Sequence, residues 1–585
     1  MPECKLWVFG SIATVYYNNG ILGNRGTIVY ISLRTSIRRK YGSIPKKDSR
    51  VILILGIVLF FTSLMLIPST VISINHGEKY WPFAVPAAIG IVLSLYMILK
   101  YRLPNDIRPA DGLMMMFSVW ILLFLFGTLP FLFSGFSLTN AIFESVSGFS
   151  TTGATIITDV ESAPRGILLW RAISNWIGGI IIVMMFMFII PMVVSGGRGL
   201  LKNEMSGSGG GNLTVKLGSA ARQFIIMYAM LTAIFTLILY IQNVTLLDSV
   251  TIAMSSISIG GFLNTNDSMA SYSMMVKISV IVFMLISASN FYLHYRALFK
   301  GDFRGYRRSE EFRIMILWFL IISLFMLIQA VISGEWEKVS GDDGDKIVDI
   351  VFSIVSVGTT SGFSTVDFTS ADWWSFVDLS LFMILMFIGG SAGSTSGGVK
   401  ISRVIITLKS LFNEIRQEVH PNAVYTVRYD GNAVPKEVVH SAMVVVTAFL
   451  IVAGVGAALF NIIMGLDDAV YLSVAMVTNT GTGSGTMFSN YEGLPIWAKY
   501  LSCILMFLGR MEILAILAVF TPGFWLEFVG RSEINRTKEK FMVITRIKEF
   551  RKKKRSREDD LPINEVIEDD GPMEITEAEA EASLK

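Results

Sequence analysis

Four short stretches of this 585-residue chain share one spacing of hydroxyl and glycine residues. In each, a Ser or Thr stands three positions before a Gly, and an Asn or Asp stands thirteen positions before that Gly. The stretches are Ser150, Thr151, Thr152, Gly153; Ser258, Ile259, Gly260, Gly261; Thr359, Thr360, Ser361, Gly362; and Thr478, Asn479, Thr480, Gly481. Oxygen ligands suit hard cations, so the pattern predicts a cation site built from four segments, here called the filter stretches.

The chemistry of the filter stretches favours a monovalent cation. Glycine allows the positive φ that aims successive carbonyl groups one way, a conformation that costs other residues ~1 kcal/mol or more. Carbonyl oxygens aimed in this way can replace the hydration shell of an ion, and the hydroxyl groups can add further ligands. None of the four stretches contains Asp or Glu, whereas divalent selectivity normally uses a ring of carboxylates.

A short helix is expected before each filter stretch, because Asn and Asp are strong N-cap residues. The four candidate caps are Asn140, Asp248, Asp349 and Asp468. A helix of about ten residues starting there spans ~15 Å, half of the ~30 Å hydrocarbon core, and its C-terminal dipole end favours a cation. Glycines also serve close helix packing in membranes, but the matched spacing at all four places favours the ion site.

Long apolar blocks surround these elements. The chain is 52% hydrophobic and 16% charged, against ~25% charged in soluble domains. A membrane span takes about 20 apolar residues, and ten segments qualify or nearly so. They are residues 50–71, 82–100, 112–133, 166–195, 222–243, 274–294, 311–333, 374–408, 439–464 and 497–520. We therefore predict an all-α membrane protein with ten transmembrane helices.

The expected organisation is a fourfold pseudosymmetric set of helix–pore loop–helix repeats around one pore, preceded by an extra helix pair. Its parts are an N-terminal segment (1–49), the extra pair (50–111), four pore repeats (112–221, 222–310, 311–438, 439–531) and a basic then acidic tail (532–585). Lys and Arg gather in alternate loops, which predicts a cell or inner membrane location with both termini cytoplasmic. In the opposite loops acidic residues far outnumber basic ones, which raises the cation concentration there.

The eighth apolar segment is interrupted by glycine and serine. Its first part, from Trp374 to Ile388, reaches only ~22 Å, so the interruption falls within the membrane, where irregular backbone must be buried or line water. We interpret it as a gating loop beneath the filter stretches; a cytoplasmic loop between two shorter helices is the alternative. The gate candidates are Gly389, Gly390, Gly393, Ser394, Thr395, Gly397, Gly398, Lys400 and Arg510.

Two of these candidates are charged. Arg510 lies inside the last apolar segment, where a charge marks an ion path unless the side chain snorkels to the interface. Below the filter stretches, its charge would form a barrier that opening must relieve. Lys400 and Arg171 are the weaker cases, since both could instead be interfacial anchors.

Five longer motifs frame the same residues. They begin at Gly148 (GFSTTGAT), Gly166 (GILLWR), Thr359 (TTSGF), Gly389 (GGSAGSTSGGVK) and Gly509 (GRMEI). Together they resemble the Trk/Ktr/HKT superfamily of potassium transporters and, with the extra helix pair, its TrkH branch in particular. The second filter stretch departs from the pattern, because the family more often has small hydroxyl residues at the positions of Ile259 and Leu263.

The resemblance implies potassium as the ion at the filter stretches and a homodimer with one pore in each subunit. It also implies a cytosolic RCK-type regulatory subunit (TrkA-like). A nucleotide (ATP, ADP or NAD) would be bound only by that partner, because this chain has no Gly-rich nucleotide fingerprint between a strand and a helix. No covalently bound cofactor and no nucleic-acid partner are expected.

Gated potassium uptake through a pore is the function that these observations favour. The alternative is a secondary transporter coupled to Na⁺ or H⁺ with alternating access, which also uses broken helices but usually has two repeats. An enzyme is not expected. The sequence has no paired intramembrane carboxylates, and Cys4, Cys503 and the four histidines lack metal-ligand spacing.

Overall fold

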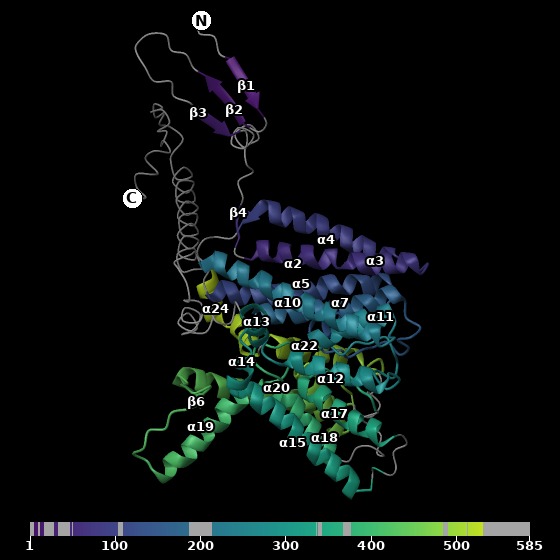
Figure 1. Cartoon of the computed structure of the whole chain (residues 1–585), viewed down its shortest axis with the longest axis vertical. Coiled ribbons are helices and arrows are strands. Elements are labelled where there is room, and N and C mark those ends of the chain that lie inside the picture. Colours follow the sequence, from purple (N-terminus) through teal and green to yellow (C-terminus); the bar gives the residue numbers. More distant parts are fainter. Residues whose placement is uncertain are drawn as a thin grey trace, which may run out of the picture. The chain divides into compact units, whose positions relative to one another are not determined.

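The protein is almost entirely helical (Figure 1), which confirms the predicted class. The computed structural model describes residues 5–9, 12–16, 29–32, 47–49, 51–102, 109–185, 213–334, 336, 342–366, 376–483, 490–511 and 513–529. The chain divides into two units, Met1–Phe520 and Thr521–Lys585. Within the second unit, helix α24 (Pro522–Val529) is described, and the predicted tail 532–585 lies outside the described residues.

A few short strands accompany the helices. β1 (Lys5–Phe9), β2 (Ile12–Tyr16) and β3 (Val29–Ser32) form an antiparallel sheet. β4 (Lys47–Asp48) pairs with β5 (Tyr101–Arg102), and β6 (Arg428–Tyr429) pairs with β7 (Asn432–Ala433). The first three were not predicted, although their β-branched and aromatic residues favour strands.

A helix stands at each of the ten predicted segments. The longer helices are α2 (Ile52–Leu64), α3 (Leu66–Asn75), α4 (Trp81–Lys100), α5 (Pro109–Phe133), α7 (Arg165–Met184), α10 (Leu213–Ile241), α12 (Met274–Ala288), α15 (Glu310–Ile332), α18 (Phe376–Ile388), α19 (Ile401–Val419), α20 (Lys436–Phe460) and α22 (Ile496–Arg510). Among the described residues, seven helical spans are long and apolar enough to cross a membrane alone, or up to nine with two bent pairs.

The two bent pairs replace spans that the sequence predicted as continuous. α12 turns by 96° into α13 (Phe291–Lys300), and α22 turns by 104° into α23 (Ile513–Val519). The first break has a local cause, because Asn290 leaves the helical conformation and its side chain accepts a bond from Tyr292 N, which starts a new helix. α14 (Arg304–Arg308) follows α13.

Four short helices lead into the filter stretches. They are α6 (Leu138–Phe149), α11 (Leu246–Ser258), α17 (Asp343–Thr359) and α21 (Leu466–Val477), with 12, 13, 17 and 12 residues. All four are longer than the ten residues predicted from the sequence.

The predicted N-caps are wrong, because each helix begins earlier than the Asn or Asp. Ser137 and Thr245 cap the first two helices, and their side chains accept the backbone N–H of Asn140 and Asp248. The predicted caps therefore lie in the first turn of these helices. There a carboxylate still stabilises the positive end of the dipole, and Asp248 also accepts the Thr245 hydroxyl at 2.7 Å. The third helix is capped by Asp342 and the fourth begins after Gly465.

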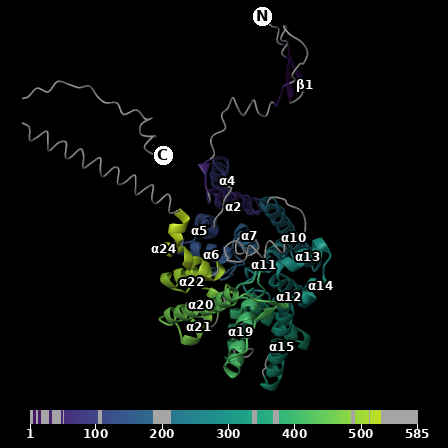
Figure 2. The ribbon, with the colours of Figure 1, turned by 90° about the vertical axis from the view of Figure 1, so that its left-hand side faces the viewer.

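Each short helix packs against the same three kinds of neighbour. It contacts the longer helix before it, the longer helix after it, and the second long helix of the preceding repeat. The third kind of contact joins α6 to α22, α11 to α7, α17 to α12 and α21 to α18. In Figure 2, α6 lies between α5 and α22 and α11 lies beside α12, as these contacts require. The succession of contacts closes on itself and brings the four filter stretches together.

Candidate cation site

The four short helices end with the same turn. Just after each helix, a backbone N–H donates to the helical carbonyl five residues earlier, at 2.8–2.9 Å. The donor and acceptor pairs are Thr152 and Ser147, Gly260 and Ser255, Ser361 and Ser356, and Thr480 and Ala475. This 6→1 bond belongs to the Schellman ending of a helix, which requires a left-handed residue just before its donor. The helix ends, with their partial negative charge, are thus fixed in one geometry.

The backbone of every filter stretch has positive φ at the second and fourth positions. The fourth-position glycines have φ between 72° and 80°. The second positions are Thr151 (54°), Ile259 (55°), Thr360 (65°) and Asn479 (57°). A left-handed conformation costs non-glycine residues ~1–2 kcal/mol, and β-branched residues adopt it only where the surroundings impose it.

The filter glycines interlock across the repeats. A Cβ atom on Gly153 would lie 2.3 Å from the carbonyl oxygen of Gly260, and one on Gly261 would lie 2.7 Å from that of Ser361. A Cβ atom on Gly362 would lie 2.1 Å from the Thr480 carbonyl oxygen, and one on Gly481 would lie 2.0 Å from that of Thr152. Each filter glycine therefore faces the carbonyl at the third filter position of the next repeat. The glycine of the fourth repeat faces the carbonyl of the first repeat, so the contacts form a closed ring.

The first-position hydroxyls donate back to their helices. Thr478 Oγ1 lies 2.8 Å from the Val474 carbonyl, and Ser258 Oγ lies 2.8 Å from that of Met254. Ser150 Oγ and Thr359 Oγ1 likewise lie within 3.3 Å of carbonyls one turn back. Ser150 and Thr478 also bond the hydroxyls of Thr152 and Thr480. A hydroxyl has two lone pairs, so each of these groups keeps at least one that can accept a cation.

A set of buried serines that the sequence reasoning missed holds the outer end of the filter stretches. The hydroxyl of Ser147, Ser255 and Ser356 donates to the carbonyl of the residue after the filter glycine, at 2.6–2.7 Å. Each serine stands six positions before that glycine, and Ala475 replaces it in the fourth repeat. This spacing was present in the sequence and could have identified them.

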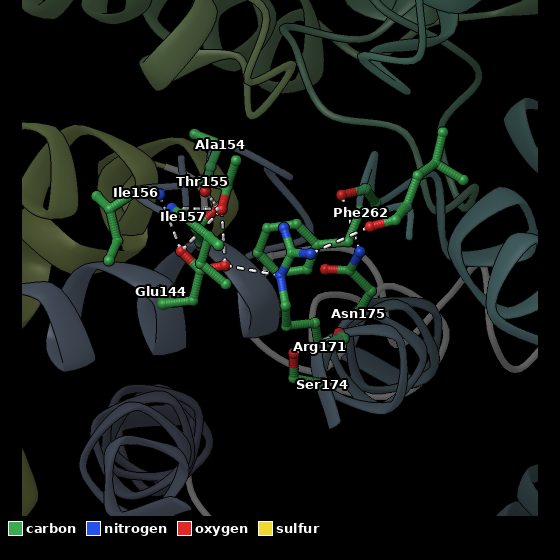
Figure 3. A network of polar contacts seen from close by, with 12 residues as sticks. Glu144, Ala154, Thr155, Ile156, Ile157, Arg171, Ser174, Asn175 and Phe262 are labelled. Carbon is green, nitrogen blue, oxygen red and sulfur yellow. Dashed lines mark hydrogen bonds and ion pairs between the residues drawn. The ribbon is translucent and has the colours of Figure 1, made fainter. Parts of the chain in front are cut away.

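A buried ion pair lies within the first repeat, and its arginine also reaches the second repeat (Figure 3). Arg171 Nε lies 2.7 Å from Glu144 Oε1, and both side chains are at most 2% exposed. The carboxylate also accepts bonds from Thr155 and Ile156, while Arg171 Nη1 donates to the Leu263 carbonyl at 3.1 Å. Arg171 is therefore not an interfacial anchor but links the residues that follow the first and second filter stretches.

Replacing Arg171 with leucine is expected to destabilise the protein by ~3–5 kcal/mol, because it leaves the Glu144 carboxylate buried without its charge partner. The measurement is the thermal unfolding temperature of the purified protein in detergent. Asp302→Asn is the matched control, since the Arg296–Asp302 pair is about one-third exposed and such pairs contribute ~0–1 kcal/mol. Equal unfolding temperatures for the two variants would contradict the expectation.

The end of the site where the short helices begin, here called its mouth, is cross-linked between repeats. Lys277 Nζ pairs with Asp349 of the third repeat at 2.8 Å, and Lys499 Nζ contacts Asn140 of the first at 2.9 Å. In the loops, the Asn266 side chain donates to Asp159 and keeps the pKa of that carboxyl below its ordinary value. Asp159 thus stays ionised at neutral pH at the mouth.

The predicted interruption of the eighth segment is present. α18 ends at Ile388 and α19 begins at Ile401. The loop between them lies against two filter stretches: Gly397 N donates to Thr360 Oγ1 at 2.7 Å, and Gly398 N donates to the Thr478 carbonyl at 3.1 Å. A Cβ on Gly397 would lie 1.9 Å from that carbonyl, so no side chain fits there.

The two charged gate candidates are buried beside this loop. Arg510 Nη1 donates to the Thr395 carbonyl at 3.0 Å, and Lys400 Nζ bonds the Ser396 carbonyl. Each residue is 3% exposed, so neither reaches the interface. Arg510 Nε and Nη2 have no hydrogen-bond partner among the described residues. A buried guanidinium with only part of its donors bonded therefore lies directly beside the loop.

The remaining gate candidates shape the loop itself. Gly389, Gly393 and Gly398 have φ near 70°, Gly390 N donates to Ser396 Oγ at 2.7 Å, and Ser394 Oγ donates to the Ser391 carbonyl at 2.6 Å. The predicted gate candidates thus form one contiguous region.

Glu311, which the sequence reasoning did not single out, anchors this loop. Its carboxylate accepts Ala392 N at 2.7 Å and Ser402 N at 3.2 Å. Two adjacent glutamates, Glu310 and Glu311, at the start of an apolar span gave only a weak signal.

Comparison with known proteins identifies the family to which this chain belongs. The sequence matches the TrkH family, described as cation transport proteins, over residues 88–523. The chain belongs to the TrkH family. It is 32% identical to the Trk system potassium uptake protein TrkH of Halomonas elongata over 490 residues, covering 81% of this chain and 98% of the relative. The Escherichia coli K12 protein of the same name is 31% identical over 483 residues, covering 80% and 98%.

A solved structure of the TrkH family agrees with the fold. The crystal structure of the potassium transporter TrkH from Vibrio parahaemolyticus superposes with a TM-score of 0.71 at 29% identity. It covers 81% of this chain and 99% of the other. The protein is therefore a multi-pass membrane protein of a transporter family.

Proposed function

We propose that this TrkH family member takes up potassium through a pore whose selectivity filter is the ring of four filter stretches. The closed succession of glycine and carbonyl contacts carries this proposal. In this proposal each repeat contributes its third-position carbonyl to the ring, next to the negative ends of the short helices. A ring of carbonyls can replace the hydration shell of a potassium ion.

Unpaired oxygens in the filter stretches support the same role. The side-chain oxygens Thr151 Oγ1, Ser361 Oγ and Asn479 Oδ1 are buried and have no partner among the described residues. A buried polar atom without a partner costs ~1–3 kcal/mol, so such atoms are expected to bind an ion or water. Because Asp and Glu do not occur in the filter stretches, a monovalent ion suits them better than a divalent one.

The loop 389–400 serves as the gate in this proposal. It bonds to Thr360 and Thr478 and, through Thr395, to the Ile257 carbonyl at the end of α11. Arg510 adds a positive charge on the same side. Ion passage then requires the loop to leave these contacts and Arg510 to move with it.

The assembly proposed for the protein follows its family. We propose a homodimer with one pore in each subunit, both termini in the cytoplasm of a cell or inner membrane, and a cytosolic RCK-type partner that binds the nucleotide. The relatives named above are potassium uptake proteins, which supports potassium as the ion.

Rubidium uptake into liposomes tests the proposal. Vesicles with the purified protein are loaded with potassium or with sodium and placed in trace rubidium. Uptake is expected in the potassium-loaded vesicles, much less in the sodium-loaded ones, and without any need for a proton gradient. Uptake that requires a sodium or proton gradient at a fixed stoichiometry would instead favour the coupled transporter.

A further inference from the structure

The second filter stretch lacks a side chain that the other three have. Thr152, Ser361 and Thr480 occupy the third position elsewhere, whereas the second repeat has Gly260. Gly260 is not among the residues with positive φ, so its backbone conformation does not require glycine. Another constraint must therefore keep a side chain out of this position.

Asn175 from α7 occupies the place of the missing side chain. A Cβ atom on Gly260 would lie 2.4 Å from both Cγ and Nδ2 of Asn175 and 2.7 Å from its Cβ. Asn175 is fully buried, and its Nδ2 donates to the Gly260 carbonyl at 2.9 Å. This carbonyl is a member of the ring, the one that faces Gly153.

A second side chain of α7 holds the residues that follow Gly260. Arg171, one turn earlier on α7, donates to the Leu263 carbonyl, and its guanidinium lies 4.1 Å from the Phe262 ring centroid. Figure 3 shows Arg171 and Asn175 extending from the same helix toward the segment that contains Phe262. Adjacent turns of α7 thus hold the Gly260 carbonyl and the Leu263 carbonyl just beyond the second filter stretch, which is otherwise the least typical of the four.

α7 also approaches the filter stretches very closely. A Cβ on Gly178 would lie 1.9 Å from the Phe149 carbonyl, and one on Gly179 would lie 2.8 Å from Ser258 Cβ. The helix therefore lies directly against these residues, and a side chain added at position 260 would meet Asn175 unless α7 moved away from them.

We propose that Asn175 is a selectivity-determining positioning residue that replaces, from a neighbouring repeat, the absent third-position side chain of the second filter stretch. Its amide keeps the Gly260 carbonyl in the ring, and its bulk fills the space behind it. The inference rests on the proposed function, because it assigns Asn175 to the selectivity of the same pore. One acceptor of Gly260 is used by the amide, and the second lone pair stays available to the ion.

A double-mutant cycle tests this proposal. Asn175→Gly, which removes the amide and also the Cβ that would lie 2.7 Å from a Cβ at position 260, is expected to lower the ratio of potassium to sodium permeability about 3- to 10-fold, the equivalent of one hydrogen bond. Gly260→Ser alone is expected to lose most flux, because the serine Cβ meets Asn175. The double variant is expected to recover flux and much of the ratio, because a glycine at position 175 removes the three Asn175 atoms that a Cβ at position 260 would meet. Such recovery is a coupling that independent sites do not show.

Ser174→Ala is the matched control on the same helix. The Ser174 hydroxyl donates only to the carbonyl of Arg171 within α7, so this variant is expected to keep the wild-type permeability ratio. An unchanged ratio in Asn175→Gly, or a double variant no better than Gly260→Ser, would overturn the proposal.

Folding failure does not leave the proposal untested. If the Asn175→Gly protein does not fold, the double variant decides: a folded, selective double variant supports the proposal, and an unfolded one overturns it. The outcomes also distinguish a failure of the proposed function from a failure of the role assigned to Asn175. A wild-type protein without potassium selectivity refutes the proposed function, whereas a selective wild type with no coupling between positions 175 and 260 refutes only the role of Asn175.

Discussion

Gly362→Ser is expected to reduce the ratio of potassium to sodium permeability at least tenfold. The serine Cβ would lie 2.1 Å from the Thr480 carbonyl oxygen, in a backbone with φ of +78°. The positive φ alone costs ~1–2 kcal/mol, and the carbonyl must also move, which opens the ring between the third and fourth repeats. A displacement that changes the difference in binding free energy between potassium and sodium by ~1.4 kcal/mol changes their relative affinity about tenfold. The measurement is the reversal potential under potassium on one side and sodium on the other.

Two control glycines separate the ring contact from other effects of the substitution. Gly135 also has positive φ (+101°), but a Cβ there would meet no atom within 4 Å. Gly454 lies within α20 and is equally open. Gly135→Ser and Gly454→Ser are therefore expected to keep the wild-type ratio. If Gly362→Ser keeps it too, the selectivity filter lies elsewhere in the molecule.

Deleting residues 389–398 is expected to raise the basal potassium leak strongly, because it removes the segment that bonds to the third and fourth filter stretches. The deletion is geometrically possible. Val399 N already donates to the Phe387 carbonyl and Lys400 N to that of Ile388, both at 2.9 Å, so the chain on either side of the loop is already close together. Leak is measured as rubidium flux in liposomes without any partner protein.

Arg510→Ala offers a milder form of the same test. It removes the bond to the Thr395 carbonyl and the charge beside the loop, and is expected to raise the leak less than the deletion does. Arg416→Ala, an exposed arginine on α19, controls for the loss of a positive charge and is expected to leak like the wild type. A deletion variant that folds but remains closed would show that the loop is not the gate.

Repetition made much of the site predictable from the sequence. A spacing that recurs four times cannot come from the packing needs of any single helix, and so it identified the filter stretches and their order. The interruption of the eighth span was equally clear, because a segment from Trp374 to Ile388 is too short to cross the membrane and Gly389 to Gly398 cannot continue a helix. These features depend on residues close together in the sequence, so one sequence is enough to predict them.

Features that depend on tertiary contacts could not be predicted in this way. Isolated Ile and Thr residues disfavour positive φ, yet Ile259 and Thr360 adopt it because the helix ending and the neighbouring repeat impose it. The role of Asn175 was hidden for the same reason, since it acts on Gly260, 85 positions away in the sequence. The bend after Ala288 was missed because hydropathy alone does not register an N-cap such as Asn290.

The N-cap error has a simple physical origin. Asn and Asp are favoured both at the cap and in the first turn, where they stabilise the helix dipole. The spacing of thirteen was real, but it marked the first turn in the helices that begin at Leu138 and Leu246. The serine or threonine three positions earlier was the better indicator, because a hydroxyl residue followed by an acidic or amide residue three positions on is typical of a helix start.

The most direct test of the central claim is a recording of single-molecule currents from the purified protein in a planar bilayer, with potassium on one side and sodium on the other. A pore built on four interlocked filter stretches predicts discrete unitary currents whose reversal potential lies close to the potassium equilibrium potential. Transport without unitary currents, or unitary currents that reverse near zero under these conditions, would contradict the account.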